Sequence, residues 1–345
     1  MHVRDDIWKK AAALRIHGGR IDVAASLYPS APTPWIDLST GINPICWPVP
    51  PVSPASYQRL PLAADIARMT AAAAGAYGCP ENATIVPVPG SEIAIRLLPR
   101  VRGAKRVGIL TPTYGSHAAS WRDAGAEVHE LDALPELRRH DLEMLILVNP
   151  NNPDGAVIAQ ADLLPFAQAW TMTGRRLVVD EAFADVRPEA SLLKLPRLPV
   201  GTAVLRSFGK FFGMAGLRVG FVVVAEPEAA AWHSLLGDWP VSGPACEIAT
   251  AALRDTTWIA ATRTRLTDDR KRLDYTLGHA GLKPIGGTDL FGLFEAPQGI
   301  DLLDHFARVG ILIRGWAMTP QRYRFGLPAD EAAWHRLKAA CSTLR

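Results

Sequence analysis

The stretch T-A-V-L-R-S-F-G-K-F-F-G-M-A-G-L-R-V-G-F-V-V-V, Thr202–Val224, decides the fold of this chain of 345 residues. It holds two short apolar runs, Thr202–Leu205 and Arg218–Val224, on either side of a glycine-rich segment. Apolar runs of this length with β-branched residues are typical of buried strands. The first run therefore predicts a strand that ends near Ser207, with Lys210 shortly beyond its end.

Three further runs of the same kind precede this stretch, and helical patterns separate them. They are Arg106–Leu110, Glu143–Val148 and Arg176–Val179. Buried strands that alternate with helices favour a mostly parallel sheet with helices on both of its faces. The sequence thus predicts an α/β fold.

Polar residues follow the carboxyl ends of these predicted strands, where open α/β sheets bind their ligands. They are Tyr114, the asparagine-rich turn Asn149–Asn152, Asp180 and Ser207–Lys210. Each has a plain structural explanation by itself: the asparagines can form a turn, Asp180 can cap a helix and Lys210 can be a surface lysine. Their order along the chain, however, describes one site.

A site for pyridoxal-5'-phosphate (PLP) fits this set of side chains. A lysine amine forms a Schiff base with the aldehyde of PLP, and an aspartate keeps its pyridine nitrogen protonated. An asparagine amide donates to the ring hydroxylate, and an aromatic side chain stacks on the ring. The phosphate of the cofactor needs hydroxyl groups, an arginine and the N-terminus of a helix.

Four motifs resemble those of the fold-type I aminotransferases, and they stand in the order of that family. They are G-S-E-I-A-I-R-L-L (Gly90–Leu98), N-P-N-N-P-D-G (Asn149–Gly155), V-V-D-E-A-F (Val178–Phe183) and S-F-G-K-F-F-G-M-A-G-L-R-V-G-F (Ser207–Phe221). The resemblance covers most of the chain. It implies the fold of fold-type I PLP-dependent transferases, with a large domain built on a mostly parallel seven-stranded sheet and a smaller α+β domain.

The resemblance implies a role for each matching residue. Lys210 is the catalytic Schiff-base lysine, Asp180 pairs with the pyridinium nitrogen, and Asn152 faces the ring hydroxyl oxygen. Tyr114 occupies the ring-stacking position. The implied ligands of the cofactor phosphate are the backbone N–H groups of Ser91 and Glu92 and the side chains of Ser207 and Arg218.

Two positions depart from the family pattern. Phe183 stands where many relatives have a tyrosine, so a hydroxyl near the ring oxygen is missing. Leu60 stands where relatives often have a tyrosine that reaches the phosphate of the neighbouring subunit, and whether Tyr57 replaces that contact stays open. The resemblance still implies a homodimer, because the active sites of such relatives lie at the subunit interface.

Changes in composition along the chain predict three parts. The proline-rich segment Pro29–Pro61 predicts an N-terminal arm over residues 1–60 that packs with the small domain, with room for one leading helix. A large PLP-binding domain is expected over residues 61–255 and a small C-terminal domain over residues 256–345. Its predicted elements are one or two helices in Ala249–Leu277, strands at Phe291–Phe294, Gly310–Ile313 and Tyr323–Phe325, and a helix over Asp330–Leu344.

The substrate contacts must decide the reaction, because PLP stabilises a carbanion whichever bond breaks. Candidate anion-binding groups lie outside the predicted sheet, in R-I-H-G-G-R (Arg15–Arg20), L-S-T-G-I-N-P (Leu38–Pro44), G-I-L-I-R-G-W (Gly310–Trp316) and R-Y-R-F-G-L-P (Arg322–Pro328). The double glycine permits a close backbone approach, and alternation with Tyr323 and Phe325 indicates a buried arginine at position 322 or 324. Ordinary turns and surface cations are the alternative explanation of each.

These segments together resemble one subgroup, the threonine-phosphate decarboxylases of cobalamin biosynthesis, which share ancestry with the histidinol-phosphate aminotransferases. The resemblance implies L-threonine O-3-phosphate as the substrate, and (R)-1-amino-2-propanol O-2-phosphate and carbon dioxide as the products. The implied substrate-binding residues are His17, Gly18, Asn43, Asn152, Arg314 and Arg324. A histidinol-phosphate-type aminotransferase and a PLP-binding sensor protein without turnover are the two alternatives.

Composition argues against several other classes of protein. The net charge is only +3 and the basic residues are scattered, so nothing favours a nucleic-acid partner. Four widely spaced cysteines form no C-x-x-C pair, which predicts no metal site and free thiols in a reducing cytoplasm. The first 20 residues lack the unbroken apolar stretch of a signal peptide, and no segment approaches an apolar run long enough for a membrane span, so a cytoplasmic protein is expected.

Overall fold

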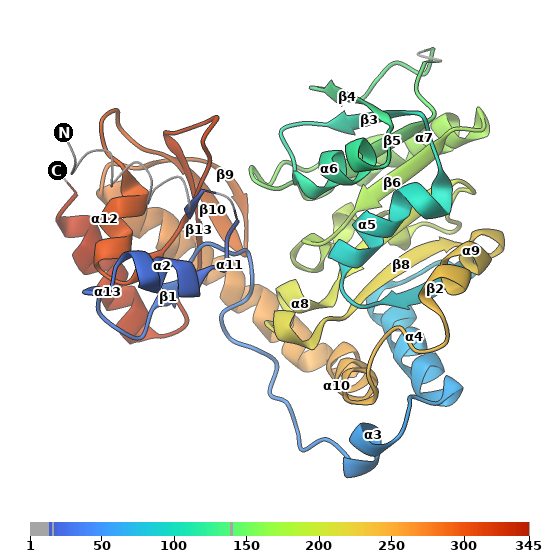
Figure 1. Cartoon of the computed structure of the whole chain (residues 1–345), viewed down its shortest axis with the longest axis horizontal. Helices are drawn as coiled ribbons and strands as arrows, with labels where there is room; N and C mark the ends of the chain where they lie inside the picture. The colour runs from blue at the N-terminus through green and yellow to red at the C-terminus, as the bar shows by residue number, and fades with distance from the viewer. Residues whose placement is uncertain (1–13, 16, 139–140, 345) are drawn as a thin grey trace. The chain divides into compact units, whose positions relative to one another are not determined.

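The structure, a computed structural model, describes residues 14–15, 17–138 and 141–344. The chain divides into two compact units. One unit is Cys46–Ala260, and the other combines Met1–Ile45 with Ala261–Arg345. The boundaries drawn from the sequence lie instead at residues 60 and 255. Helix α11 (Thr256–His279) continues from the first unit into the second (Figure 1).

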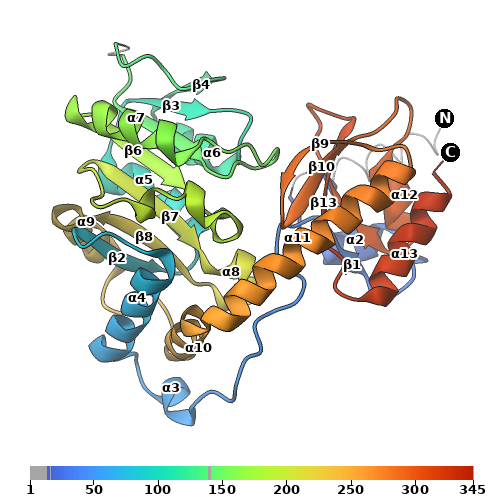
Figure 2. The ribbon, with the colours of Figure 1, turned by 180° about the vertical axis from the view of Figure 1, so that it is seen from behind.

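A seven-stranded sheet forms the core of the first unit (Figure 2). Strand β8 is antiparallel to both of its neighbours, whereas all other neighbouring strands are parallel. The predicted α/β fold with a mostly parallel sheet is therefore confirmed. The strands, in their order across the sheet, are β2 (Ala83–Val88), β8 (Gly220–Ala225), β7 (Thr202–Ser207), β6 (Arg176–Asp180), β5 (Met144–Val148), β3 (Arg106–Leu110) and β4 (Glu127–Leu131).

The two edge strands, β2 and β4, were not predicted from the sequence. Strand β2 contains Pro87, which lacks a backbone N–H and is tolerated at the edge of a sheet. Strand β4 has the sequence E-V-H-E-L, and only its last residue is buried. Neither strand carries the continuous apolar run by which the central strands are recognised.

Helices cover both faces of this sheet. Met144 and Ile146 of β5 point to one face and pack in a core cluster with residues of α5 (Ser91–Arg102), α6 (Ser116–Asp123) and α9 (Glu226–Leu236). The intervening residues of β5 point to the opposite face and are also buried. The remaining long helices of this unit are α4 (Ala63–Tyr77), α7 (Gln160–Met172) and α10 (Gly243–Arg254).

The second unit has an α+β architecture. A four-stranded antiparallel sheet runs in the order β12 (Arg314–Gly315), β13 (Arg322–Gly326), β10 (Phe291–Glu295) and β9 (Lys283–Thr288). The short strand β1 (Ile36–Asp37) pairs in parallel with β11 (Ile311–Leu312), which joins the N-terminal segment to the C-terminal part of the chain. The described part of this unit includes the helices α2 (Ile21–Leu27), most of α11, α12 (Leu302–Arg308) and α13 (Glu331–Ser342).

The segment Ala249–Leu277 contains two helices rather than one. Helix α10 ends at Arg254, and α11 begins at Thr256. Between them, Asp255 accepts a hydrogen bond from the backbone N–H of Trp258 at 2.9 Å, which is typical of a residue that caps a helix N-terminus. Among the described residues, no helix is both long and apolar enough to cross a bilayer.

Candidate active site

Three parallel strands bring the predicted site residues of the first unit to one edge of the sheet. Val148 of β5 lies opposite Asp180 of β6, which in turn lies opposite Leu205 of β7. Ser207 ends β7, and Lys210 follows in the short helix α8 (Phe208–Phe211). The asparagine turn, the aspartate and the Ser-x-x-Lys segment therefore all begin at the carboxyl edge of neighbouring strands.

Asp180 is buried and both of its carboxylate oxygens are held. Oδ2 lies 2.9 Å from Nε2 of His117, and Oδ1 accepts the backbone N–H of Ala182 at 3.0 Å. His117 lies fully buried in α6, and the ring of Tyr114 packs edge to face against its imidazole at a centroid distance of 6.3 Å. Burial raises the pKa of Tyr114 above its usual value. The carboxylate thus has a single orientation.

The lysine has an aromatic neighbour. Lys210 is half-buried, and its Nζ lies 5.6 Å from the ring centroid of Phe183. Phe183 is buried and follows the Asp180 strand in the D-E-A-F motif. The position where the sequence departs from its relatives is therefore filled by an apolar ring that faces the amine.

Side-chain hydrogen bonds of Asn149 and Asn151 hold the asparagine turn in place. The side chain of Asn149 donates to the carbonyl groups of Ile158 and Ala190 and accepts the N–H of Ile158. Asn151 donates to the Pro112 carbonyl at 2.8 Å and accepts the Thr113 hydroxyl at 2.7 Å. These bonds hold the loop that carries the half-buried Asn152.

An anion-binding arrangement lies at the start of α5. The helix begins at Ser91 after Gly90, whose φ of 91° suits glycine. A Cβ at Gly90 would lie 2.5 Å from Nη2 of Arg218, so the missing side chain lets the guanidinium approach the helix terminus. A Cβ at Gly220 would likewise lie 2.6 Å from the backbone nitrogen of Ser91. Free backbone N–H groups at Ser91 and Glu92, together with a guanidinium, suit a phosphate.

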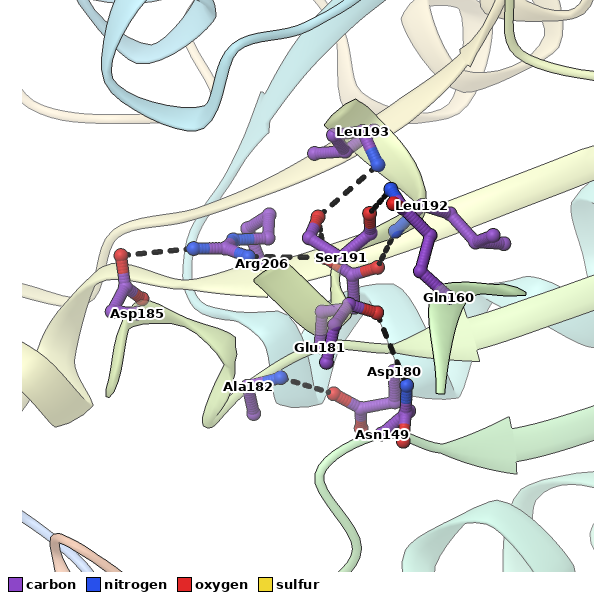
Figure 3. Close-up of polar contacts among 11 residues, drawn as sticks. Asn149, Gln160, Asp180, Glu181, Ala182, Asp185, Ser191, Leu192, Leu193 and Arg206 are labelled. Carbon is purple, nitrogen blue, oxygen red and sulfur yellow. Dashed lines mark hydrogen bonds and ion pairs between the residues drawn. The ribbon is translucent and has the colours of Figure 1, made fainter. Parts of the chain in front are cut away.

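A buried ion network lies beside the Asp180 strand (Figure 3). Arg206 of β7 bridges two carboxylates: its Nη1 lies 3.0 Å from Oε2 of Glu181, and its Nη2 lies 2.8 Å from Oδ1 of Asp185. Ser191 donates its hydroxyl to Glu181 at 2.5 Å, and the backbone N–H of Leu192 donates to the other oxygen. Glu181 follows Asp180 and Arg206 precedes Ser207, so the network ties together the ends of the two strands that carry the site.

Charge pairing in this network opposes the effect of burial. Burial lowers the pKa of Arg206, but Asp185 and Glu181 outweigh that effect and raise it overall. Burial raises the pKa of Glu181, against the opposing effect of Arg206 and of two hydrogen-bond donors. The guanidinium also stacks over the ring of Tyr77, at 4.1 Å from its centroid. Removal of the arginine would therefore leave two carboxylates buried without their cation.

We expect Arg206→Met to lower the free energy of unfolding by about 3–5 kcal/mol, the usual cost of breaking a buried ion pair from one side. The measurement is urea denaturation of the protein without cofactor. Arg122→Met is the matched control, because Arg122 pairs with Glu130 on the surface and its loss should cost less than about 1 kcal/mol. Equal losses of unfolding free energy in the two variants would show that the buried network stabilises the fold no more than a surface ion pair does.

Two arginines face each other in the second unit. Arg314 of β12 lies directly opposite Arg324 of β13, so both side chains start from the same face of the small sheet. Arg324 is buried, lies 4.9 Å from the ring centroid of Phe291, and donates from Nη2 to the Ser39 carbonyl at 2.8 Å. Arg322 is exposed, so the buried arginine left open by the sequence is Arg324.

The N-terminal His-Gly-Gly segment lies against Ser39, whose carbonyl also accepts Arg324. Arg314 donates from Nη1 to the carbonyl of Arg15, two residues before His17, at 2.7 Å. His17 is exposed, and a Cβ at Gly18 would lie 2.6 Å from the carbonyl oxygen of Ser39. This close approach requires a glycine at position 18, whereas an ordinary turn would not require one.

Asn43 is buried and has a structural partner that the sequence did not indicate. Its Oδ1 accepts a hydrogen bond from Nη2 of Arg265 at 2.7 Å and another from the backbone N–H of Ile45 at 3.1 Å. Arg265 lies on α11 and also pairs with Asp269 one turn later. The role of Arg265 was missed because contacts between residues more than 200 positions apart leave no local pattern in the sequence.

Comparison with known proteins places the chain in a family. The model of the aminotransferase class I and II family matches residues 55–295. The threonine-phosphate decarboxylase of Pseudomonas aeruginosa is 43% identical over 94% of this chain and 96% of its own length, and that of Sinorhizobium sp is 42% identical over 95% and 98%. This chain belongs to the threonine-phosphate decarboxylase family. The relation suggested by the N-terminal and C-terminal motifs is thereby confirmed.

Solved structures of aminotransferases share the fold of this chain. The histidinol-phosphate aminotransferase of Sinorhizobium meliloti, solved in complex with pyridoxal-5'-phosphate, superposes with a TM-score of 0.73 over 85% of this chain and 85% of its own. Its sequence is 20% identical to this member of the decarboxylase family, so the likeness establishes the shared fold alone.

The side chains at the carboxyl edge of the large sheet suit PLP, as expected for a member of the threonine-phosphate decarboxylase family. A buried carboxylate held by an imidazole can face a protonated ring nitrogen, and a half-buried lysine amine can meet an aldehyde. The missing Cβ of Gly90 lets the Arg218 guanidinium approach the start of α5, where backbone N–H groups and a cation together suit a phosphate. The donor set therefore matches both the ring and the phosphate of the cofactor.

Proposed function

We propose that this protein is a PLP-dependent carboxy-lyase of cobalamin biosynthesis. Its reaction converts L-threonine O-3-phosphate into (R)-1-amino-2-propanol O-2-phosphate and carbon dioxide. The observation that carries the proposal is the 43% identity with a threonine-phosphate decarboxylase over nearly the whole of both chains. Histidinol-phosphate aminotransferases share the fold, but the solved one of Sinorhizobium meliloti is only 20% identical to this chain.

The residues at the carboxyl edge of the sheet hold the cofactor and move the proton. When bound, PLP supplies an electron sink for the carbanion left by the loss of carbon dioxide. Asp180, oriented by His117, holds the proton on the ring nitrogen, and the Lys210 amine forms the covalent link and delivers a proton to Cα of the substrate. The ring of Phe183 lies beside that amine, with its centroid 5.6 Å from Nζ.

The remaining contacts to the cofactor come from nearby loops and from the start of α5. Tyr114 stacks on the ring, and Asn152 donates to the ring oxygen. The proposed ligands of its phosphate are the N–H groups of Ser91 and Glu92 and the side chains of Ser207 and Arg218.

The arginines of the small sheet bind the two anionic ends of the substrate, which carries a carboxylate and a phosphate. Arg314 and Arg324 start from one face of the sheet, and guanidinium groups bind both kinds of anion through paired N–H groups. The further substrate contacts that we propose are His17, the backbone of Gly18, Asn43 and Asn152.

The test of the function is incubation of the protein and PLP with L-threonine O-3-phosphate. We expect carbon dioxide and 1-amino-2-propanol O-2-phosphate in equal amounts. An aminotransferase would instead convert the cofactor into its pyridoxamine form and stop without an acceptor. That result, with no carbon dioxide released, would contradict the proposal.

We expect Arg324→Ala and Arg314→Ala each to lower kcat/KM for phosphothreonine at least about thirtyfold. The reason is that a desolvated anion left without its cation typically costs about 2–5 kcal/mol. Arg322→Ala is the matched control, because Arg322 lies on the same strand but is exposed. If both variants match the control, the substrate anions bind elsewhere.

We also propose that the protein is a cytoplasmic homodimer. Support comes from four exposed apolar side chains in the segment that leads into α4, a concentration that suits a protein interface. They are Val49, Tyr57, Leu60 and Leu62. Sedimentation at micromolar concentration should give the mass of a pair, and a fully active monomer would contradict the proposal.

A further inference from the structure

The helix that carries Lys210 is too short to hold its position by itself. Helix α8 spans Phe208–Phe211, which is a single turn, and isolated helices of that length are unstable in water. The place of the Lys210 amine therefore depends on what packs against α8. Figure 2 shows α8 next to the beginning of α11.

Two aromatic side chains that follow Lys210 make this packing. Phe211 and Phe212 are both buried. The ring of Phe212 stacks on that of Trp258, in the first turn of α11, at a centroid distance of 5.7 Å. The ring of Phe211 meets the same indole edge to face, also at 5.7 Å. The backbone N–H of Phe212 donates to the Lys210 carbonyl, so a shift of these rings moves the lysine as well.

Trp47 holds the same turn from a distant part of the sequence. It is 6% exposed, and its backbone N–H donates to the carbonyl of Phe212 at 3.0 Å. Its indole N–H donates to Oδ2 of Asp255 at 3.0 Å. Phe212 is thus held through its ring by Trp258 and through its carbonyl by Trp47.

Asp255 joins the two tryptophans with its two carboxylate oxygens. Oδ1 accepts the backbone N–H of Trp258 at 2.9 Å, and Oδ2 accepts the indole of Trp47. The hydrogen bonds from Trp258 and from Trp47 hold the pKa of this carboxyl below its usual value, so it is ionised at neutral pH and both oxygens accept. The contacts form a closed circuit that runs through Phe212, Trp258, Asp255 and Trp47.

The cap at the N-terminus of α11 explains only half of this circuit. One carboxylate oxygen suffices for a cap, and Asp255 uses Oδ1 for it. The other oxygen binds a tryptophan 208 positions away, and the backbone of that tryptophan meets the turn that carries Lys210. The second contact therefore sets where α8 lies against the start of α11.

We propose that Trp47 and Asp255 are a pair of positioning residues for Lys210. Their hydrogen bond fixes the orientation of α8, and thereby the direction in which the lysine amine points. This inference rests on the proposed function, because it takes Lys210 as the lysine that reacts with PLP. In that reaction the unprotonated amine adds to the aldehyde carbon, and the aldehyde oxygen leaves as water with the two amine hydrogens. The rate of such a step depends steeply on the geometry of approach.

Trp47→Phe tests the pair with a small change. It removes the indole N–H but keeps an aromatic ring and the backbone N–H that binds Phe212. Trp170→Phe is the matched control, because Trp170 is also a buried tryptophan of this unit and donates from Nε1 to the Arg176 carbonyl at 3.0 Å. Arg176 begins β6, at the opposite end of that strand from Asp180. The control therefore loses the same kind of bond away from the site.

The measurement is the rate at which the cofactor-free protein, mixed with PLP, gains the absorbance band of the lysine-bound cofactor. Borohydride reduction and peptide masses then identify the lysine that carries the bond. We expect Trp47→Phe to slow this reaction about tenfold and Trp170→Phe to change its rate less than about twofold. In steady-state assays Trp47→Phe should lower kcat for phosphothreonine about tenfold and change KM less than about twofold, because the amine acts in the chemical step.

Asp255→Asn is a second variant of the same contact. Its amide places an NH2 group against one of the two N–H donors, so one of the bonds is lost. It should slow bond formation with PLP, and the double variant with Trp47→Phe should be little slower than the slower single variant, because both changes break one circuit. If Trp47→Phe does not fold, the comparison of Asp255→Asn with Asp123→Asn, at an exposed aspartate of α6, decides the role.

A purely structural role gives a different result. Trp47→Phe and Trp170→Phe would then both lower the unfolding midpoint and react with PLP at the parent rate. That outcome would overturn the positioning role while leaving the decarboxylase function intact. If instead the parent protein forms the bond at Lys210 but releases no carbon dioxide from phosphothreonine, the proposed reaction is wrong, and the rates of bond formation still decide the role of the pair. A bond at another lysine would overturn the inference at its premise.

Discussion

Lys210→Ala should release no measurable carbon dioxide from phosphothreonine. The variant loses the amine that links PLP to the protein and that protonates Cα of the substrate, and loss of a group with two roles typically lowers kcat by about 10⁴-fold or more. Lys210 is half-buried after β7, and its Nζ lies 5.6 Å from the ring centroid of Phe183. The measurement is carbon dioxide release at saturating substrate.

Covalent attachment gives a second measurement for the same variant. Borohydride treatment should fix the cofactor to the parent protein and not to Lys210→Ala, as read from the mass of the intact protein. Lys194→Ala is the control, because Lys194 is an exposed lysine of the same unit. A reduced PLP–protein bond that persists in Lys210→Ala would show that another lysine is the reacting one.

Asp180→Asn should retain the fold and lower kcat by about 10³-fold. The amide has nearly the same shape as the carboxylate and can still accept the N–H of Ala182, but it carries no charge to hold the proton on the ring nitrogen. The measurements are kcat for phosphothreonine and the unfolding midpoint of the cofactor-free protein. Asp123→Asn, at an exposed aspartate of α6, is the control.

Near-normal turnover in Asp180→Asn would make this residue a structural cap of the chain that follows β6. The contact between Asp180 and His117 argues for the catalytic role, because a cap needs no buried imidazole 2.9 Å from its second oxygen. The unfolding midpoint distinguishes a chemical defect from a folding defect.

The central strands and the motifs that follow them could be predicted because their information is local. A run such as M-L-I-L-V is buried on both faces of the sheet, so an unbroken series of apolar residues in the sequence indicates it. The polar residues at strand ends stand out against these runs. The family motifs at Asp180 and Lys210 were recognised for the same reason.

Contacts between segments that are far apart in the sequence produce no such local pattern. His117 lies 63 positions before Asp180, and Arg206 lies 25 positions after Glu181. The arginine within T-A-V-L-R-S is a charge inside an apolar strand, and it was the one local sign of the buried network. Its partners could not be named, because a buried charge can be neutralised from any strand or loop that packs on it.

The sequence by itself determined the fold class, the family and the residue types of the cofactor site, because short-range periodicity and motifs encode them. Tertiary structure alone decided that Arg314 and Arg324 lie opposite each other and that Ser39 joins the His-Gly-Gly segment to Arg324. The physical reason is that strand register and loop closure are set by packing of the whole unit, and a shift of one residue would turn each arginine to the other face of its sheet.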